Sequence, residues 1–229
     1  KTAAFLLPAL QALGAGAAPS APAAAAPRRG RSRPRILVLC PTRELAQQVA
    51  REAILLVRFL KGVRIASVVG GVAFAKQLMD LRGATLVVAT PGRLLDLARN
   101  GQIDLEAVQT LVVDEADRML DLGFSDDLAE INQLTSQRQQ TMMFSATFAP
   151  RIQQLAMRVM HDNGASVQKI QIDSPQEKHA NIKQVLFWAD NAAHKRKLLD
   201  HWLRDTTIDQ AIVFASTQIE CDGLANDLQ

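Results

Sequence analysis

Short apolar runs separated by amphipathic stretches organise the chain from about residue 35 onward. The apolar runs predict strands, in chain order, at Arg35–Cys40, Val63–Val69, Thr85–Ala89, Thr110–Val113, Thr141–Phe144 and Val167–Ile172. The stretches between them predict helices at Arg43–Leu60, Phe74–Leu81, Arg93–Arg99, Asp126–Leu134 and Pro150–Met160. Continuous apolar strands that alternate with helices predict an α/β fold, with a parallel sheet covered by helices on both faces and ligand groups at the carboxyl ends of the strands.

Two polar segments interrupt this pattern. Residues 14–35 are rich in Ala and Pro and then in Arg, which predicts a low-complexity loop that is either a solvated surface or an extra contact to phosphate. Residues 174–181 predict a linker between a first domain, 1–173, and a second, 182–229. The second domain begins with a strand at 182–188, a helix at 193–204, a strand at 210–215 and a helix at 219–228. It is incomplete, because a parallel sheet needs more than two strands.

Composition excludes several classes of protein. Hydrophobic residues make up 48% and charged residues 21% of the chain, no apolar run is long enough to span a bilayer, and the N-terminus lacks the features of a secretory signal. We therefore expect a cytoplasmic protein with no membrane partner. Cys40 and Cys221 lie far apart and outside any Cys/His cluster, which argues against disulfides and zinc.

The charge is unevenly distributed. The formal net charge is +3, and leaving out the five arginines between Arg28 and Arg35 changes it to −2. A nucleic-acid surface on the rest of the chain would therefore depend on a few placed cations and on backbone N–H groups.

The polar group with the clearest chemistry is Asp114-Glu115-Ala116-Asp117, directly after an apolar strand. Adjacent carboxylates at the end of a strand are typical of a site that holds Mg²⁺ against a nucleotide. Asp114 would hold the ion, largely through water, and Glu115 would orient and deprotonate the attacking water. The alternative is an acidic helix N-terminus, which the helix dipole favours.

Lys1-Thr2, followed by an apolar helix from Ala3 to Pro8, is similar to the end of a phosphate-binding loop. In that interpretation Lys1 would be a catalytic residue that contacts the β- and γ-phosphates, and the Thr2 hydroxyl would ligate Mg²⁺. A chance Lys-Thr pair is the alternative.

Four motifs occur in the order and approximate spacing of the DEAD-box helicases: Pro41-Thr42-Arg43-Glu44-Leu45-Ala46, Thr90-Pro91-Gly92-Arg93, Asp114-Glu115-Ala116-Asp117 and Ser145-Ala146-Thr147. The chain therefore resembles an ATP-dependent RNA helicase of superfamily 2. The resemblance implies a RecA-like first domain, the first part of a second RecA-like domain, and ATP and Mg²⁺ as cofactors. It also implies RNA-stimulated ATP hydrolysis coupled to local unwinding of RNA, which is held through its backbone and not by sequence.

The same resemblance assigns the remaining site residues. Residues of the first domain that would line the RNA track are Pro41, Thr42, Arg43, Gly71, Thr90, Pro91, Gly92 and Arg93. Ser216 and Thr217 would contact RNA or the other domain from the second domain. The hydroxyls of Ser145 and Thr147 would bond Asp117 and couple the ATP site to domain closure. Ordinary helix capping is the alternative for these Ser, Thr and Pro-Gly positions.

The family's phosphate-loop glycines, adenine-reading segment and arginine-finger motifs are not in this sequence, so we expect the 229-residue chain alone to hydrolyse ATP negligibly. A non-catalytic RNA-binding or scaffold protein, and a DNA helicase of related type, are the rival interpretations. Ribosome-assembly or RNA-decay factors are candidate protein partners.

Overall fold

The computed structural model describes residues 1–15, 31–160, 167–170, 183 and 185–228. The chain divides into two compact units, Lys1–Pro175 and Gln176–Gln229, each of which is described by itself. Among the described residues, no helix is both long and apolar enough to cross a membrane. The expected linker at 174–181 lies outside the described residues.

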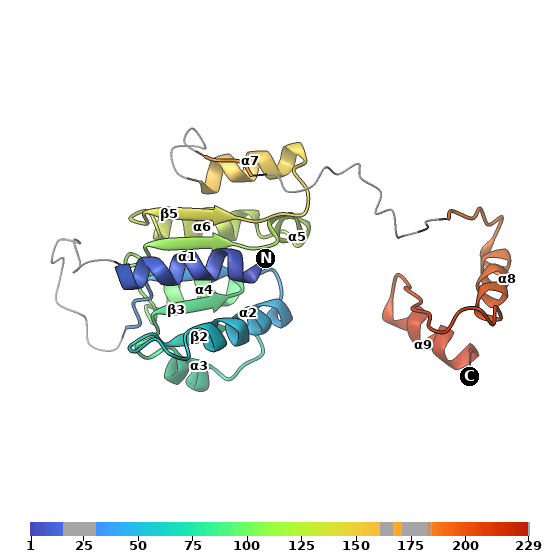
Figure 1. The fold of residues 1–229 in the computed structure, drawn as a ribbon, viewed down its shortest axis with the longest axis horizontal. Helices are drawn as coiled ribbons and strands as arrows, with labels where there is room; N and C mark the ends of the chain where they lie inside the picture. The colour runs from blue at the N-terminus through green and yellow to red at the C-terminus, as the bar shows by residue number, and fades with distance from the viewer. Residues whose placement is uncertain (16–30, 161–166, 171–182, 184, 229) are drawn as a thin grey trace. The chain divides into compact units, whose positions relative to one another are not determined.

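The first unit is built on a five-stranded parallel sheet, in which every strand runs in the same direction (Figure 1). The order across the sheet is β2-β3-β1-β4-β5, so β1 is central and pairs with β3 on one side and β4 on the other. The strands are β1 (Ile36–Leu39), β2 (Ile65–Val68), β3 (Leu86–Ala89), β4 (Thr110–Val113) and β5 (Gln140–Met143). All four residues of β1, β3 and β4 are buried, as their continuous apolar sequences predict.

Helices cover both faces of this sheet, because alternate side chains of each strand point to opposite faces. On one face Ile36 and Val38 pack with α1 (Thr2–Ala15) and α2 (Arg43–Leu56), which cross in front of the sheet in Figure 1. On the other face Leu37 and Leu39 belong to the core cluster that the remaining helices complete. These are α3 (Phe74–Leu81), α4 (Pro91–Arg99), α5 (Ala116–Asp121), α6 (Ser125–Leu134) and α7 (Pro150–Val159).

A buried arginine holds α6, β5 and α7 together. Arg138 is 5% exposed, and its Nη2 donates to the Val159 carbonyl at 2.5 Å and to Asn132 Oδ1 at 2.6 Å. Its Nη1 donates to the Thr135 carbonyl at 3.1 Å, and its Nε donates to Thr141 Oγ1 at 2.6 Å. Burial lowers the pKa of the guanidinium. Its charge is compensated by carbonyls at the C-terminal ends of α6 and α7, where the helix dipoles are negative.

The expectation that residues 14–35 form one loop is wrong at both ends. Helix α1 continues to Ala15, and the segment after Gly30 is docked on the chain that leads into β4. Ser32 forms a parallel bridge with Ile103, and Arg33 pairs with Asp104 at 2.9 Å. The Ser32 hydroxyl is buried and donates to the Leu81 carbonyl at 2.8 Å. Composition alone did not indicate this docking, because it depends on the specific partners of Ser32 and Arg33.

The second unit contains the two predicted helices, as α8 (Ala192–Leu203) and α9 (Gln218–Asp227). The strands expected at 182–188 and 210–215 are not formed at any described residue, and Phe214 in the second of these runs is 90% exposed. Residues 167–170 of the strand expected at the end of the first domain are not in a strand either. An apolar run becomes a strand only where neighbouring strands accept its hydrogen bonds, and the described residues provide no such neighbours here.

Candidate functional site

The carboxyl ends of the four strands β1 to β4 carry the polar motifs. Cys40 and Pro41 follow β1, Gly70 and Gly71 follow β2, and Thr90 follows β3. Asp114 follows β4, and its backbone N–H donates to the Leu39 carbonyl at 3.0 Å. Parallel strands thus bring residues that are far apart in the sequence to one edge of the sheet, which lies toward the N mark in Figure 1.

Lys1 and the Asp114-Glu115 pair meet at this edge. The Lys1 Nζ lies 2.8 Å from Asp114 Oδ1 and 3.8 Å from Glu115 Oε1. The Asp114 side chain is 1% exposed and that of Lys1 is 46% exposed, so a surface lysine reaches a fully buried carboxylate. A buried carboxylate is costly unless it is paired, and Lys1 supplies part of the compensation.

Glu115 has an unusual backbone. Its φ of 49° and ψ of 55° place it in the left-handed region, and it is the one described residue other than glycine with a positive φ. Its N–H donates to Asp114 Oδ1 at 2.9 Å, and its side chain makes no capping hydrogen bond to α5. Glu115 is nevertheless the N-cap residue of α5 and Asp117 lies in its first turn, so the acidic helix N-terminus of the alternative is also observed. Strained residues of this kind cluster at functional sites.

Cys40 belongs to this site and was missed by the sequence analysis. Its thiol is fully buried, and burial, followed by the charges of Asp114 and Glu115, raises its pKa far above 9.0, while Lys1 opposes the shift. The thiol is therefore neutral and not nucleophilic. Only the adjacency of β1 and β4 could have revealed Cys40, and a single sequence does not give the strand order.

The turn after β2 brings together the residues expected to hold RNA. Arg43 Nη1 donates to the Gly70 carbonyl at 3.2 Å, and Arg93 Nη2 donates to the Val72 carbonyl at 3.1 Å. Arg43 is exposed and Arg93 is half-buried, with its Nε buried and lacking a hydrogen-bond partner among the described residues. The Pro41–Arg43 and Thr90–Arg93 segments thus each donate a hydrogen bond to the same turn.

Gly71 fits this turn for two reasons. Its φ is +77°, a conformation that side-chain-bearing residues rarely adopt. A Cβ at this position would also lie 2.1 Å from Arg43 Nη1. Gly70 has neither constraint, since a Cβ there would meet nothing within 4 Å.

The two threonines in these segments differ in what they do. Thr42 caps α2, and its Oγ1 accepts from the Leu45 N–H at 3.3 Å, so the capping interpretation holds for it. Thr90 precedes Pro91 at the start of α4, is 9% exposed and makes no side-chain capping bond. The start of α4 therefore presents backbone N–H groups that its own threonine does not cap, an arrangement suited to phosphate.

The expected bond between Asp117 and the Ser145 or Thr147 hydroxyl is not formed within the described part of the chain. Ser145 Oγ is buried and has no partner among the described residues, and Thr147 is exposed. Neither residue caps α7, whose N-cap is Ala149 without a side-chain bond. A role for these hydroxyls in coupling stays a prediction.

Ser216 and Thr217 lie in the second unit. Thr217 Oγ1 caps α9 by accepting from the Glu220 N–H at 3.2 Å, and Glu220 Oε2 accepts from the Ser216 N–H at 2.9 Å. Both residues are exposed. The capping role is observed for Thr217, and the contact of both residues with RNA stays a prediction.

One observation supports Mg²⁺ binding at the Asp114-Glu115 pair. Asp114 Oδ2 is buried and has no hydrogen-bond partner among the described residues, so a carboxylate oxygen is left over at the site. Within the described ranges no three His, Cys, Asp or Glu side chains cluster as a ready-made metal cage. Mg²⁺ commonly needs none, because it binds through one or two carboxylates, water and substrate phosphates.

Comparison with known proteins agrees with this geometry. Residues 1–155 match the family model described as DEAD/DEAH box helicase. The chain is 38% identical over 231 residues to the ATP-dependent RNA helicase SrmB of Escherichia coli K12, covering 100% of this chain and 49% of that protein. It is 40% identical over 193 residues to the ATP-dependent RNA helicase DbpA of the same organism, covering 84% and 41%.

Two solved structures are also similar. The yeast DEAD-box splicing factor Prp28 matches 99% of this chain and 50% of its own, with a TM-score of 0.63 and 29% identity. A hypothetical ATP-dependent RNA helicase from Sulfolobus tokodaii matches 70% and 42%, with a TM-score of 0.59 and 37% identity.

A five-stranded parallel sheet in the order 2-3-1-4-5, with a lysine and two acids at its carboxyl edge, defines a RecA-like nucleotide-binding domain. The chain belongs to the DEAD/DEAH box helicase family, on its DEAD-box branch. It spans about half the length of the curated relatives named above.

Proposed function

We propose that this chain carries the ATP-hydrolysing and RNA-binding half of an ATP-dependent RNA helicase. The observation that carries the proposal is the 2.8 Å pair between Lys1 and the buried Asp114, with Glu115 beside it. The family match and the names of the relatives support ATP as the nucleotide and RNA as the substrate. The 182–229 segment would then begin a second RecA-like domain.

Each residue at the acidic edge has a separate task. Asp114, through its free oxygen, and Thr2, at the start of α1, would hold Mg²⁺ together with water. Lys1, which is 46% exposed and pairs with Asp114 here, would contact the β- and γ-phosphates. ATP would supply the phosphoryl group, and Mg²⁺ would offset the negative charge on the phosphates. Glu115 orients the attacking water and takes its proton.

RNA is held at the turn after β2. Arg43 and Arg93 supply positive charge, while the backbone N–H groups of Gly92 and Arg93 lie in the first turn of α4. These groups contact sugar and phosphate, so little base specificity follows. Asp117, Ser145 and Thr147 would link the nucleotide site to closure of the two domains, and Ser216 and Thr217 would contact RNA from the second. A cytoplasmic location, and ribosome-assembly or RNA-decay factors as partners, stay predictions.

Steady-state ATP hydrolysis by the longer protein that contains this chain tests the proposal. Glu115→Gln should lower RNA-stimulated turnover by about 100-fold or more, because general-base catalysis contributes that much. Glu106→Gln, which removes an exposed carboxylate far from the site, is the matched control. Unchanged turnover in Glu115→Gln would contradict the assignment, and absence of turnover in the wild type would favour a non-catalytic scaffold. Stimulation by DNA as strong as by RNA would favour a DNA helicase.

A further inference from the structure

The amino ends of the strands form a second polar edge, opposite the candidate site. Backbone bonds join the residues that precede each strand, with Arg64 O accepting from Thr85 N at 2.9 Å and Thr85 O accepting from Arg35 N at 2.8 Å. Arg35 O accepts from Gln109 N, and Gln109 O accepts from Gln139 N, both at 2.8 Å. These five residues, the amino-edge row, stand side by side at intervals of about 4.8 Å. None of them is acidic.

At one end of the row are two exposed arginines, Arg64 and Arg82. The Arg64 side chain lies beside Gly83, where an added Cβ would be 3.8 Å from both Arg64 Cδ and Nη1, and Arg82 precedes Gly83 in the chain. Gly83 has a φ of +67°, which fixes this turn against Arg64. Within the described part of the chain neither Arg64 nor Arg82 forms a salt bridge, so the two positive charges favour an anion.

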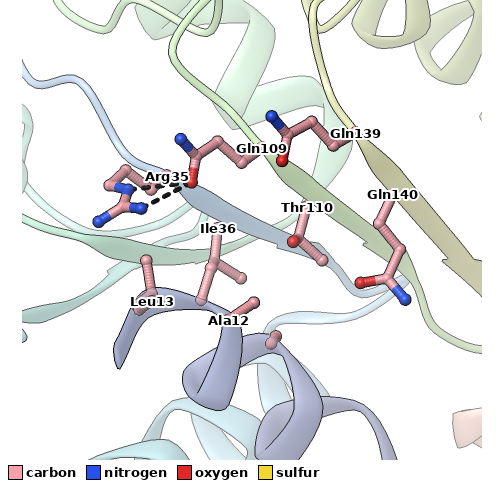
Figure 2. A pocket seen from close by; sticks show the side chains of 9 residues that line it. Ala12, Leu13, Arg35, Ile36, Gln109, Thr110, Gln139 and Gln140 are labelled. Atoms are coloured by element: carbon pink, nitrogen blue, oxygen red, sulfur yellow. Dashed lines mark hydrogen bonds between the residues drawn. The ribbon is translucent and has the colours of Figure 1, made fainter. Parts of the chain in front are cut away.

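At the middle of the row a pocket of about 190 Å³ opens between the strands and the end of α1 (Figure 2). Arg35 donates from Nε and Nη2 to Gln109 Oε1 at 3.0 and 2.8 Å. The acceptor is a neutral amide, so this bond orients the guanidinium without cancelling its charge. Gln139 and Gln140 line the same pocket and carry amides that bond phosphate oxygens or ribose hydroxyls.

An exposed aromatic residue lies among cations beside the row. Phe59, just beyond α2, is 89% exposed, and the Arg58 guanidinium lies 5.6 Å from the centre of its ring. Lys61 follows, and the Gly62 carbonyl accepts from Thr85 Oγ1 at 3.4 Å, which joins this turn to the row. Cations interleaved with an exposed ring are typical of surfaces that bind single-stranded nucleic acid.

We propose that the amino-edge row, with the Phe59–Lys61 turn, is a second contact surface for the sugar-phosphate backbone of RNA. This inference rests on the proposed function, because it takes RNA as the substrate. The surface lies at the opposite edge of the sheet from the turn after β2, so it binds a different part of the same RNA or a second strand. Its arginine and amide side chains supply hydrogen-bond donors and positive charge for phosphate and ribose oxygens, so the contact that we propose is to the backbone.

Fluorescence anisotropy of the 229-residue chain with a labelled oligouridylate, measured over a range of salt concentrations, tests this surface. The double variant Arg64→Gln, Arg82→Gln should lower the slope of log affinity against log salt by about 0.7 for each phosphate that the variant no longer neutralises. Phe59→Ala should weaken binding with little change in the slope, because stacking is not ionic. Arg51→Gln, an exposed α2 arginine away from the row, is the matched control and should change neither.

The outcomes separate this surface from the proposed function. Arg43→Gln changes the turn after β2 and should weaken RNA binding whether or not the row takes part. If the double variant kept the wild-type salt slope while Arg43→Gln weakened RNA binding, the inference would be overturned and the proposed function would stand. Absence of RNA binding by the wild-type chain at low salt would overturn both. If the Arg51→Gln control lowered the salt slope equally, the effect would depend only on the net charge of the chain, and the inference would be overturned.

Discussion

At the scale of single residues, the site combines strain with buried charge. Glu115 occupies a left-handed conformation next to a carboxylate that is 1% exposed, and neither feature stabilises the fold. Left-handed backbone costs a residue with a side chain about 1–2 kcal/mol. Such costs are expected where a reaction requires a side chain in one fixed orientation.

Glu115→Asn should therefore stabilise the first unit by about 1 kcal/mol, because asparagine tolerates the left-handed region and removes a charge beside Asp114. Urea unfolding of the chain, followed by circular dichroism, measures this change. Glu106→Asn removes a carboxylate from an exposed position with ordinary backbone and should leave the midpoint unchanged. A lower midpoint for Glu115→Asn would show that its backbone is not strained.

The two adjacent glycines after β2 give a paired comparison. Gly71→Ala should destabilise the unit by about 1 kcal/mol, because of its φ of +77°, and should weaken RNA binding by displacing Arg43 from the Gly70 carbonyl. Gly70→Ala meets no atom within 4 Å and should do neither. Urea unfolding and RNA anisotropy of both variants check this, and equal effects at the two positions would contradict it.

At the scale of elements, apolar runs predicted the five strands of the sheet, with β4 matched at both ends, because buried parallel strands need continuous apolar sequence. The same signal failed at 210–215, where the run has no neighbouring strand among the described residues. Helix α5 was not predicted, since six residues hold too little periodicity to recognise. Motifs marked the candidate residues, while the meeting of Lys1 with Asp114 and of Arg43 with the turn after β2 depended on the arrangement of the strands.

Arg138 shows how a charged side chain can organise elements. Arg138→Met should destabilise the first unit by about 3 kcal/mol, because the buried carbonyls of Thr135 and Val159 lose their charged donor. Arg99→Met, which breaks an exposed pair with Glu130, should have a much smaller effect. Urea unfolding of both variants is the measurement. A small effect at Arg138 would show that water replaces its hydrogen bonds.

At the scale of the whole molecule, the two units differ in what they bury. Both core clusters consist of residues from the first unit, and neither α8 nor α9 has a buried residue. Most helical stability in proteins comes from packing of an apolar face, and isolated helices of 10–12 residues are marginal in water. The second unit should therefore be the less stable of the two.

Hydrogen exchange measured by mass spectrometry should detect this difference. Amides of β1, β3 and β4 should exchange only with global unfolding, while those of α8 and α9 should exchange within seconds. Peptides from α2, which packs on the sheet, are the internal control for a helix with a buried face. Slow exchange in α8 would contradict the prediction and indicate packing that the described residues do not provide.

Helix α1 joins the two polar edges of the sheet. It begins beside Lys1 at the acidic pair, ends at the pocket lined by Ala12 and Leu13, and its 14 residues span about 21 Å. Pro8 lies inside this helix and cannot donate a backbone hydrogen bond, yet Phe5, Leu6, Ala9 and Leu10 are buried on either side of it. One packed helix therefore spans the distance between the two edges, and a change in its position at either end would have to be accommodated by the core that it covers.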